Sequence, residues 1–139
     1  MIAILKYNAG NVTSVENAVK NLGYQVVITN DAEILKSAEK VIFPGVGEAS
    51  SAMHYLRNNG LDKVISQLKQ PVLGICLGMQ LMCKSSEEGQ TSGLGIFHTK
   101  VLKFPSKGLV PQMGWNNFSS LESRLFDGIT CEDNCYFVH

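Results

Sequence analysis

The chain has 139 residues, and its 12 basic and 12 acidic side chains give a formal net charge of zero. This balance supplies no electrostatic basis for binding nucleic acid or an anionic membrane surface. No apolar run reaches the ~20 residues that a membrane-spanning helix needs. The length suits one hydrophobic core, so we predict a single domain over residues 1–139.

The N-terminal sequence MIAILKYNAG has no basic leader and no small-residue cleavage site, so it indicates a first strand rather than a secretion signal. The four cysteines, Cys76, Cys83, Cys131 and Cys135, form no Cys-x-x-Cys pair, and no histidine completes an obvious zinc set. Cys131 and Cys135 could share a metal, but two reduced thiols in a cytoplasmic protein are the simpler interpretation. We therefore predict neither a metal nor another cofactor.

Short apolar runs alternate with segments of helical composition through the first half of the chain. The predicted strands are residues 2–7, 25–29, 40–43 and 72–75, and the predicted helices are residues 13–23, 31–37, 48–58 and 61–68. Thr13-Ser14-Val15-Glu16 matches a capping box at the start of the first helix. This alternation is typical of βαβ units, so we predict an α/β fold with a mostly parallel sheet and helices on both faces.

The pattern loosens after Lys84. Residues 85–93 (SSEEGQTSG) have the composition of a surface loop, and residues 105–117 indicate an irregular segment. Residues 100–104 and 135–139 are predicted strands.

Cys76 directly follows the predicted strand 72–75 and stands in the pattern Gly74-x-Cys76-x-Gly78. Parallel sheets place ligand sites at the carboxyl ends of their strands. The spacing matches the G-x-S-x-G nucleophile elbow, with sulfur in place of the hydroxyl. A helix N-terminus there would favour the thiolate, and the Leu77 N–H would stabilise an oxyanion. We predict a nucleophile; the alternative is a buried cysteine beside glycines kept for helix–sheet packing.

Two further features are expected at the same edge of the sheet. The Pro44-Gly45-Val46-Gly47 sequence follows the strand 40–43, and its glycines allow N–H groups to point at a ligand, although an ordinary turn has the same composition. Gln80 lies four residues after Cys76 on the same helical face, where it would bind a substrate or line a pocket edge. Together these features predict a thiol, an anion-stabilising loop and a polar group that recognises the substrate.

The sequence GICLGMQLM (residues 74–82), with PGVG upstream, resembles the class I glutamine amidotransferases. Residues 7–15 (YNAGNVTSV), 93–105 (GLGIFHTKVLKFP) and 110–118 (VPQMGWNNF) resemble one branch of that family, the glutaminase subunits of imidazole glycerol phosphate synthases in histidine biosynthesis. The C-terminal YFVH is similar to the start of that branch's YFVHSY segment. The resemblance covers residues 2–139 and implies a flavodoxin-like amidotransferase domain.

The resemblance also implies a role for individual residues. Cys76 would attack the side-chain amide of glutamine, forming a glutamyl thioester and releasing ammonia. The implied oxyanion hole consists of the Leu77 N–H and the backbone of Val46 and Gly47. The implied ligands of the glutamine head group are Gly47, Gln80 and Glu88. Of these, the Glu88 carboxylate suits the α-ammonium of the substrate.

In this branch of the family, ammonia passes to a (β/α)₈-barrel cyclase partner, which makes imidazole glycerol phosphate and an aminoimidazole carboxamide ribonucleotide. Asn11, Met113, Trp115 and Asn116 match segments that face this partner. An exposed Trp115 would suit an interface anchor, although a core tryptophan fits the sequence equally well.

Three departures from the family pattern stand out. Asn8 and Gln112 occupy positions where many members have Gly and His. The family's catalytic base and its orienting carboxylate lie in a His-Pro-Glu motif downstream of YFVHSY, and these 139 residues contain no such motif. We therefore expect the domain to be C-terminally incomplete and the 139-residue chain alone to lack the full mechanism. Among the histidines, His139 is the strongest alternative base, because it ends a predicted strand at the edge where Cys76 is expected. Its alignment with YFVHSY makes it a different residue from the family's base, so we favour a structural or interface-lining role for it.

Two other functions remain open at this point. A sibling class I amidotransferase would serve another synthase, but the QMGWN sequence argues against it. A non-catalytic or redox-sensing α/β domain would use Cys76 as a reactive thiol without glutamine chemistry, and Gln80 and the PGVG sequence argue against that. If glutamine protects Cys76 against an alkylating reagent, the thiol belongs to a glutamine site; this experiment therefore distinguishes the redox-sensing function from the amidotransferase functions.

Overall fold

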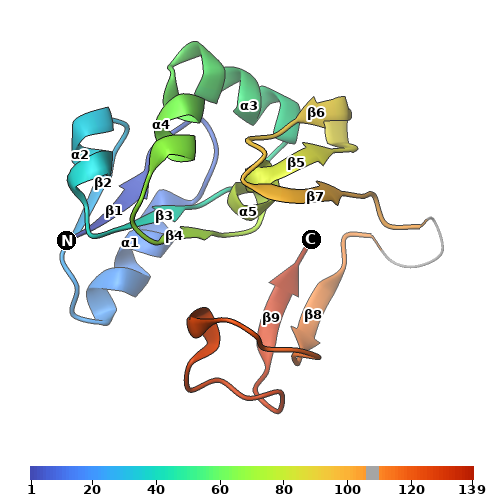
Figure 1. Cartoon of the computed structure of the whole chain (residues 1–139). Helices are drawn as coiled ribbons and strands as arrows, with labels where there is room; N and C mark the ends of the chain where they lie inside the picture. Colours follow the sequence, from blue (N-terminus) through green and yellow to red (C-terminus); the bar gives the residue numbers. More distant parts are fainter. Residues whose placement is uncertain (106–109) are drawn as a thin grey trace. The chain divides into compact units, whose positions relative to one another are not determined.

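The computed structural model describes residues 1–105 and 110–139, so residues 106–109 of the predicted irregular segment lie outside the described residues. The chain divides into two compact units, Met1–Lys103 and Phe104–His139. The first unit contains a four-stranded sheet, the helices that cover it and a small three-stranded sheet (Figure 1). The second unit contains a two-stranded sheet.

The four-stranded sheet is parallel throughout, and its strand order is β2-β1-β3-β4. The strands are β1 (Ile2–Leu5), β2 (Val26–Thr29), β3 (Lys40–Phe43) and β4 (Val72–Gly74). Each coincides with a predicted strand, because contiguous apolar residues are what a strand covered on both faces requires. The order is that of the first four strands of a flavodoxin-like sheet, so the predicted α/β class is confirmed.

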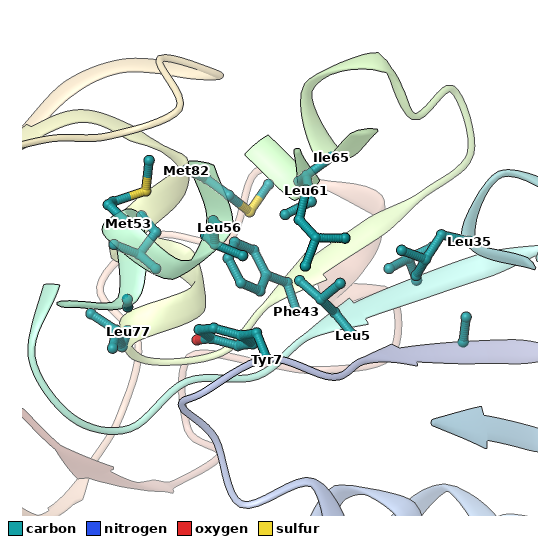
Figure 2. Close-up of a cluster of buried hydrophobic side chains, with 14 of the residues drawn as sticks. Leu5, Tyr7, Leu35, Phe43, Met53, Leu56, Leu61, Ile65, Leu77 and Met82 are labelled. Carbon is teal, nitrogen blue, oxygen red and sulfur yellow. The ribbon is translucent and has the colours of Figure 1, made fainter. Parts of the chain in front are cut away.

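Helices cover both faces of this sheet, as predicted. They are α1 (Val12–Asn21), α2 (Ala32–Ser37), α3 (Ala49–Asn58), α4 (Leu61–Gln67) and α5 (Leu77–Met82). Side chains alternate along each strand, so Leu5 and Phe43 point to one face, where they form a core with α2, α3, α4 and α5 (Figure 2). Ile4 and Ile42 point to the other face and pack against Val19 of α1.

The start of α1 differs from its prediction. Asn11 is the N-cap, and its side chain accepts a hydrogen bond from the Ser14 N–H at 3.3 Å. Glu16 forms an i,i+4 ion pair with Lys20 at 2.8 Å instead of reaching back to Thr13. The predicted capping box is therefore wrong. Asparagine is at least as good an N-cap as threonine, and it stands one residue before the helix.

The chain after α5 forms the three-stranded sheet, whose order is β6-β5-β7. Its elements are β5 (Cys83–Ser86), the 3₁₀ turn η1 (Glu88–Gln90), β6 (Thr91–Ser92) and β7 (Phe97–Val101). The predicted loop over residues 85–93 is thus wrong where β5 and β6 form, and the strand predicted at 100–104 begins at Phe97. The serine- and glutamate-rich composition hid these short strands, because it lacks the alternation of apolar and polar residues that marks a half-buried strand.

The second unit is built on an antiparallel pair of strands, β8 (Met113–Asn116) and β9 (Cys135–Val138), with the 3₁₀ turn η2 (Arg124–Phe126) between them in sequence. The β9 prediction is confirmed, whereas the predicted irregular segment contains β8. Phe118 contacts the rings of Phe126 and Phe137, with centroids 5.7 and 6.3 Å away, and this aromatic cluster packs the unit.

Candidate active site

Cys76 lies at the carboxyl edge of the parallel sheet, between β4 and α5. The neighbouring strand β3 ends at the same edge, where Pro44-Gly45-Val46-Gly47 follows it; we call these four residues the 44–47 loop. The Ile75 N–H donates to the Phe43 carbonyl at 3.0 Å, which ties the end of β4 to the start of this loop. The structure therefore brings together the two segments that the sequence analysis placed at one edge.

The backbone of Cys76 adopts φ +50° and ψ −117°, a conformation that side-chain-bearing residues rarely occupy. The side chain is exposed to solvent. The Gln80 N–H then donates to the Cys76 carbonyl at 3.0 Å and begins the hydrogen bonding of α5. A strained residue with an exposed thiol between a strand and a helix is a nucleophile elbow in form. The alternative of a buried cysteine is wrong.

The glycines on either side of Cys76 permit a close approach of backbone segments. A Cβ atom on Gly78 would lie 1.9 Å from the Phe43 carbonyl oxygen. One on Gly74 would lie 2.6 Å from the Met79 Cα. Real Cβ atoms do not approach other atoms this closely, so both positions exclude any side chain while α5 packs against β3 and β4. These contacts hold the turn that presents Cys76.

The 44–47 loop packs against the first turn of α5. A Cβ on Gly45 would lie 2.4 Å from the Gly78 nitrogen and 2.8 Å from the Leu77 Cβ. Gly47 has φ +107°, which favours glycine, and Val46 is exposed. Leu77, Val46 and Gly47, the predicted oxyanion-hole residues, therefore belong to two segments in contact beside the thiol. Their role as donors remains a prediction.

Glu48 directly follows the 44–47 loop and is the N-cap of α3. Its carboxylate accepts hydrogen bonds from the Ser51 and Ser50 N–H groups at 2.8 and 2.9 Å. These bonds, the one from Ser51 first, hold the pKa of Glu48 below its ordinary value. Sequence analysis placed Glu48 inside the predicted helix 48–58 and assigned it no role, whereas α3 begins at Ala49 and Glu48 is its N-cap.

Glu88 lies on η1 and contacts the same helix end. Its Oε2 atom accepts a hydrogen bond from the Ala49 N–H at 2.9 Å, although 39 residues separate the two in sequence. A Cβ on Gly89 would lie 2.7 Å from the Glu48 Oε1, so η1 packs closely on this cap. Its partner Ala49 is two residues after Gly47, so the structure brings the Glu88 carboxylate to the segment that directly follows the 44–47 loop. Gln80, also predicted to bind substrate, is half-buried on α5.

Tyr7 is a further residue at this edge that sequence analysis did not single out. It follows β1, and its hydroxyl donates to the Pro44 carbonyl at 2.7 Å. Burial raises the pKa of Tyr7 above its ordinary value, and the charge of Cys76 raises it further. The tyrosine is part of the quoted YNAGNVTSV sequence, but nothing in that sequence indicates a contact across 37 residues.

The predicted interface residues fall into two groups. Met113 and Trp115 are exposed on β8, Trp115 by 72%, so the alternative of a core tryptophan is wrong. Antiparallel pairing places Val138 and Tyr136 opposite them, both also exposed. We call these four residues the β8–β9 face; sequence analysis missed the half that β9 contributes. Asn11, in the first unit, caps α1, and Asn116 is an exposed residue at the end of β8.

His139 belongs to the second unit. Its backbone N–H and carbonyl both pair with Gln112, and its ring contacts Phe104 edge-on at 5.1 Å. The favoured structural or interface-lining role of His139 and the alternative role as a base both remain predictions.

Within residues 1–105 and 110–139, no helix is both long and apolar enough to cross a membrane. In the same ranges, no group of three or more histidine, cysteine, aspartate and glutamate side chains is arranged to hold a metal ion.

Comparison with known proteins identifies relatives over nearly the whole chain. The family model for glutamine amidotransferase class-I matches residues 3–139. The imidazole glycerol phosphate synthase subunit HisH of Bacteroides fragilis is 57% identical over 141 residues, which cover 99% of this chain and 72% of the relative. The subunit of the same name from Haemophilus influenzae is 46% identical over 140 residues, covering 99% and 70%.

A solved structure described as a crystal structure of glutamine amidotransferase superposes with a TM-score of 0.69 at 19% sequence identity. The match covers 84% of this chain and 62% of that one. At this identity the likeness concerns the fold, and the chain spans less than two thirds of that protein.

Proposed function

Since the chain belongs to the class I glutamine amidotransferase family, we propose that it releases ammonia from glutamine as the glutaminase subunit of an imidazole glycerol phosphate synthase. The observation that carries this proposal is the exposed Cys76, held at positive φ between two close-packed glycines and beside the 44–47 loop. The high identity to HisH subunits favours this synthase over those served by sibling amidotransferases.

The proposed reaction starts with attack of the Cys76 Sγ on the side-chain amide carbon of glutamine. The carbonyl oxygen becomes an oxyanion, which the Leu77 N–H and the backbone of Val46 and Gly47 stabilise. The carbon–nitrogen bond then breaks, and the nitrogen leaves as ammonia with the thiol proton. The His-Pro-Glu motif that supplies the family's proton-carrying base is not among these 139 residues, so the proposal assigns them the nucleophile and the glutamine pocket of the reaction. Water cleaves the resulting thioester to give glutamate and restores the thiol, so the net reaction is glutamine plus water to glutamate plus ammonia.

We propose that Glu88 binds the α-ammonium of glutamine. One carboxylate oxygen accepts the Ala49 N–H, so the carboxylate is anchored at the helix end that follows the 44–47 loop. Charge-assisted hydrogen bonds of an ammonium to a fixed carboxylate are among the stronger polar contacts. Gln80, one helical turn after Cys76, and Gly47 complete the proposed pocket.

We also propose that both units form one amidotransferase domain, since the family match extends across them.

None of the four cysteines, at positions 76, 83, 131 and 135, is in a disulfide. This state supports the proposal of a cytoplasmic location.

The proposed partner is a (β/α)₈-barrel cyclase that receives the ammonia. The β8–β9 face supports this, because its exposed apolar side chains include Trp115 and Tyr136, whose rings contact each other edge-on at 5.5 Å. Tryptophan and tyrosine are enriched among residues that dominate interface energies. The proposal therefore assigns this face, with Asn11 and Asn116, to the cyclase.

The proposed function is tested by glutamine protection of Cys76. Iodoacetamide alkylation of Cys76 is followed by peptide mass spectrometry with and without glutamine, and asparagine, one methylene shorter, is the control. We expect glutamine to slow alkylation of Cys76 and asparagine to have little effect. Equal alkylation rates in all three conditions would indicate a reactive thiol without glutamine chemistry.

Two substitutions at Glu88 separate the proposed binding of the substrate ammonium by its charge from its hydrogen bond to the Ala49 N–H. Glu88→Gln keeps an oxygen that accepts the Ala49 N–H but removes the negative charge. We expect it to raise the glutamine concentration for half-protection of Cys76 about tenfold, as for loss of a charged hydrogen bond. Thermal melting should be unchanged in Glu88→Gln and lowered in Glu88→Ala, which also loses the cap. Unaltered protection in Glu88→Gln would remove Glu88 from the ammonium site.

Truncation of Trp115 tests the proposed interface. We expect Trp115→Ala to weaken binding of the cyclase by about 30-fold, the effect of a central aromatic anchor worth roughly 2 kcal/mol. Leu125→Ala, another exposed apolar residue of the second unit, is the matched control. Isothermal titration calorimetry measures both. Equal dissociation constants for the two variants would place the interface elsewhere.

A further inference from the structure

Tyr7 joins the hydrophobic core to the 44–47 loop. Its side chain is 8% exposed, and its ring packs edge-on against Phe43 with centroids 5.4 Å apart. Figure 2 shows the Tyr7 ring beside Phe43 in this core. The Tyr7 hydroxyl donates to the buried Pro44 carbonyl at 2.7 Å. The ring is thus part of the core, and the hydroxyl is the part that binds the loop.

The bonded carbonyl controls the orientation of the loop. Proline fixes φ at residue 44, so the Pro44–Gly45 peptide can turn only about ψ of residue 44, and the hydrogen bond to its carbonyl restrains that turn. A Cβ on Gly45 would lie 2.8 Å from the Tyr7 hydroxyl and 2.4 Å from the Gly78 nitrogen. The Tyr7 hydroxyl and the first turn of α5 therefore both lie close to Gly45, on the side from which a side chain would project.

A buried carbonyl that loses its donor is costly, and the backbone turns to find another partner where it can. Glycines at 45 and 47 make such a turn easy, because both tolerate positive and negative φ. The loop composition that allows N–H groups to face a ligand also allows them to face away. One bond at the start of the loop can therefore decide between the two orientations.

We infer that Tyr7 is a positioning residue: its hydroxyl holds the 44–47 backbone in the orientation that stabilises the oxyanion formed when Cys76 reacts. The inference rests on the proposed function, because it assigns Tyr7 to the 44–47 loop of that same site. It differs from a purely structural role, since the aromatic ring alone fills the core.

The test compares Tyr7→Phe with Tyr24→Phe, a control at an exposed tyrosine. Each protein is treated with iodoacetamide, from which the Cys76 sulfur displaces iodide without forming an oxyanion. Each is also treated with a glutamine analogue in which an aldehyde replaces the amide. Cys76 adds to that aldehyde as a hemithioacetal: the carbon–sulfur bond forms, and the thiol proton ends on the former carbonyl oxygen. The oxygen of this adduct takes the position of the oxyanion, so the stability of the adduct reports on the hydrogen-bond donors at that position.

We expect Tyr7→Phe to weaken hemithioacetal formation at Cys76 about tenfold, part of the 10²–10³-fold effect of deleting an oxyanion donor. The glutamine concentration for half-protection and the rate of iodoacetamide alkylation should stay within about twofold of the parent protein. The melting temperature should stay within a few degrees of the parent. Tyr24→Phe should match the parent in every assay.

Equal aldehyde binding by Tyr7→Phe and the parent would overturn the inference and leave the proposed function intact. An equal loss of aldehyde binding and of glutamine protection would also overturn it, because Tyr7 would then shape the pocket rather than the oxyanion loop. Absence of an aldehyde adduct at Cys76 in the parent would overturn the proposed function, and this inference with it.

Discussion

Replacement of Cys76 by glycine should abolish labelling by glutamine-like electrophiles and stabilise the protein by about 1 kcal/mol. Relief of the backbone strain at this residue gains about 1–3 kcal/mol, and the flexibility that glycine adds to the unfolded chain offsets part of that gain. The reason is the conformation of residue 76, at φ +50° and ψ −117°, which glycine adopts without a Cβ clash. Denaturant unfolding and intact-mass analysis measure the two effects.

Cys76→Ala is the matched variant, because it removes the thiol and keeps the Cβ. Its unfolding free energy should stay within about 0.5 kcal/mol of the parent, while labelling is lost as in Cys76→Gly. Cys131→Ser, at an exposed cysteine of the second unit, should leave labelling of Cys76 intact. A Cys76→Gly protein no more stable than Cys76→Ala would show that the turn stores no strain.

The second large effect is expected at Gly78. A methyl group there would lie 1.9 Å from the Phe43 carbonyl oxygen, so Gly78→Ala forces α5 away from β3. We expect a loss of about 3 kcal/mol in the free energy of unfolding, the upper range for overpacking a close contact. The displaced helix also carries the Leu77 N–H with it, so Cys76 should react more slowly with glutamine analogues.

Gly23→Ala separates the steric clash from the general effect of replacing a glycine. Gly23 has φ +82° and open space around its Cβ position, so the substitution should cost only about 1 kcal/mol through its backbone conformation. Guanidinium unfolding curves of the two variants make the comparison. A loss at Gly78 no larger than that at Gly23 would contradict the close packing of α5 on β3.

The parallel sheet was predictable from the sequence because its strands are contiguous apolar runs bounded by turn residues. Val41, Ile42 and Phe43 are all buried, and such a run has few alternatives to a strand between two helical layers. The elbow was predictable for a related reason. Glycines two residues before and after Cys76 are a local signal of close backbone approach, and both do approach neighbouring backbone.

The contacts that complete the site were not predictable, because they join residues distant in sequence. Glu88 reaches the Ala49 N–H and Tyr7 reaches the Pro44 carbonyl, across 39 and 37 residues. No local pattern encodes such pairs. They depend on how η1 and β1 are placed by the packed core, and resemblance to a family indicated Glu88 without indicating its partner.

The β8–β9 face combines both situations. Met113 and Trp115 were recognised from a local sequence, but Tyr136 and Val138 join them only through strand pairing. In an antiparallel pair each residue of one strand lies beside one residue of the other strand on the same face. The register of β8 and β9 was therefore needed to identify the two residues that β9 contributes.

The most direct test of the account is the intact mass of the protein before and after treatment with a diazoketone analogue of glutamine, followed by peptide mapping. The account predicts one adduct per chain, located at Cys76, reduced by glutamine and absent in Cys76→Ala. An adduct distributed over the exposed cysteines without protection by glutamine, or no adduct at Cys76, would contradict the assignment of this residue as a glutamine-directed nucleophile.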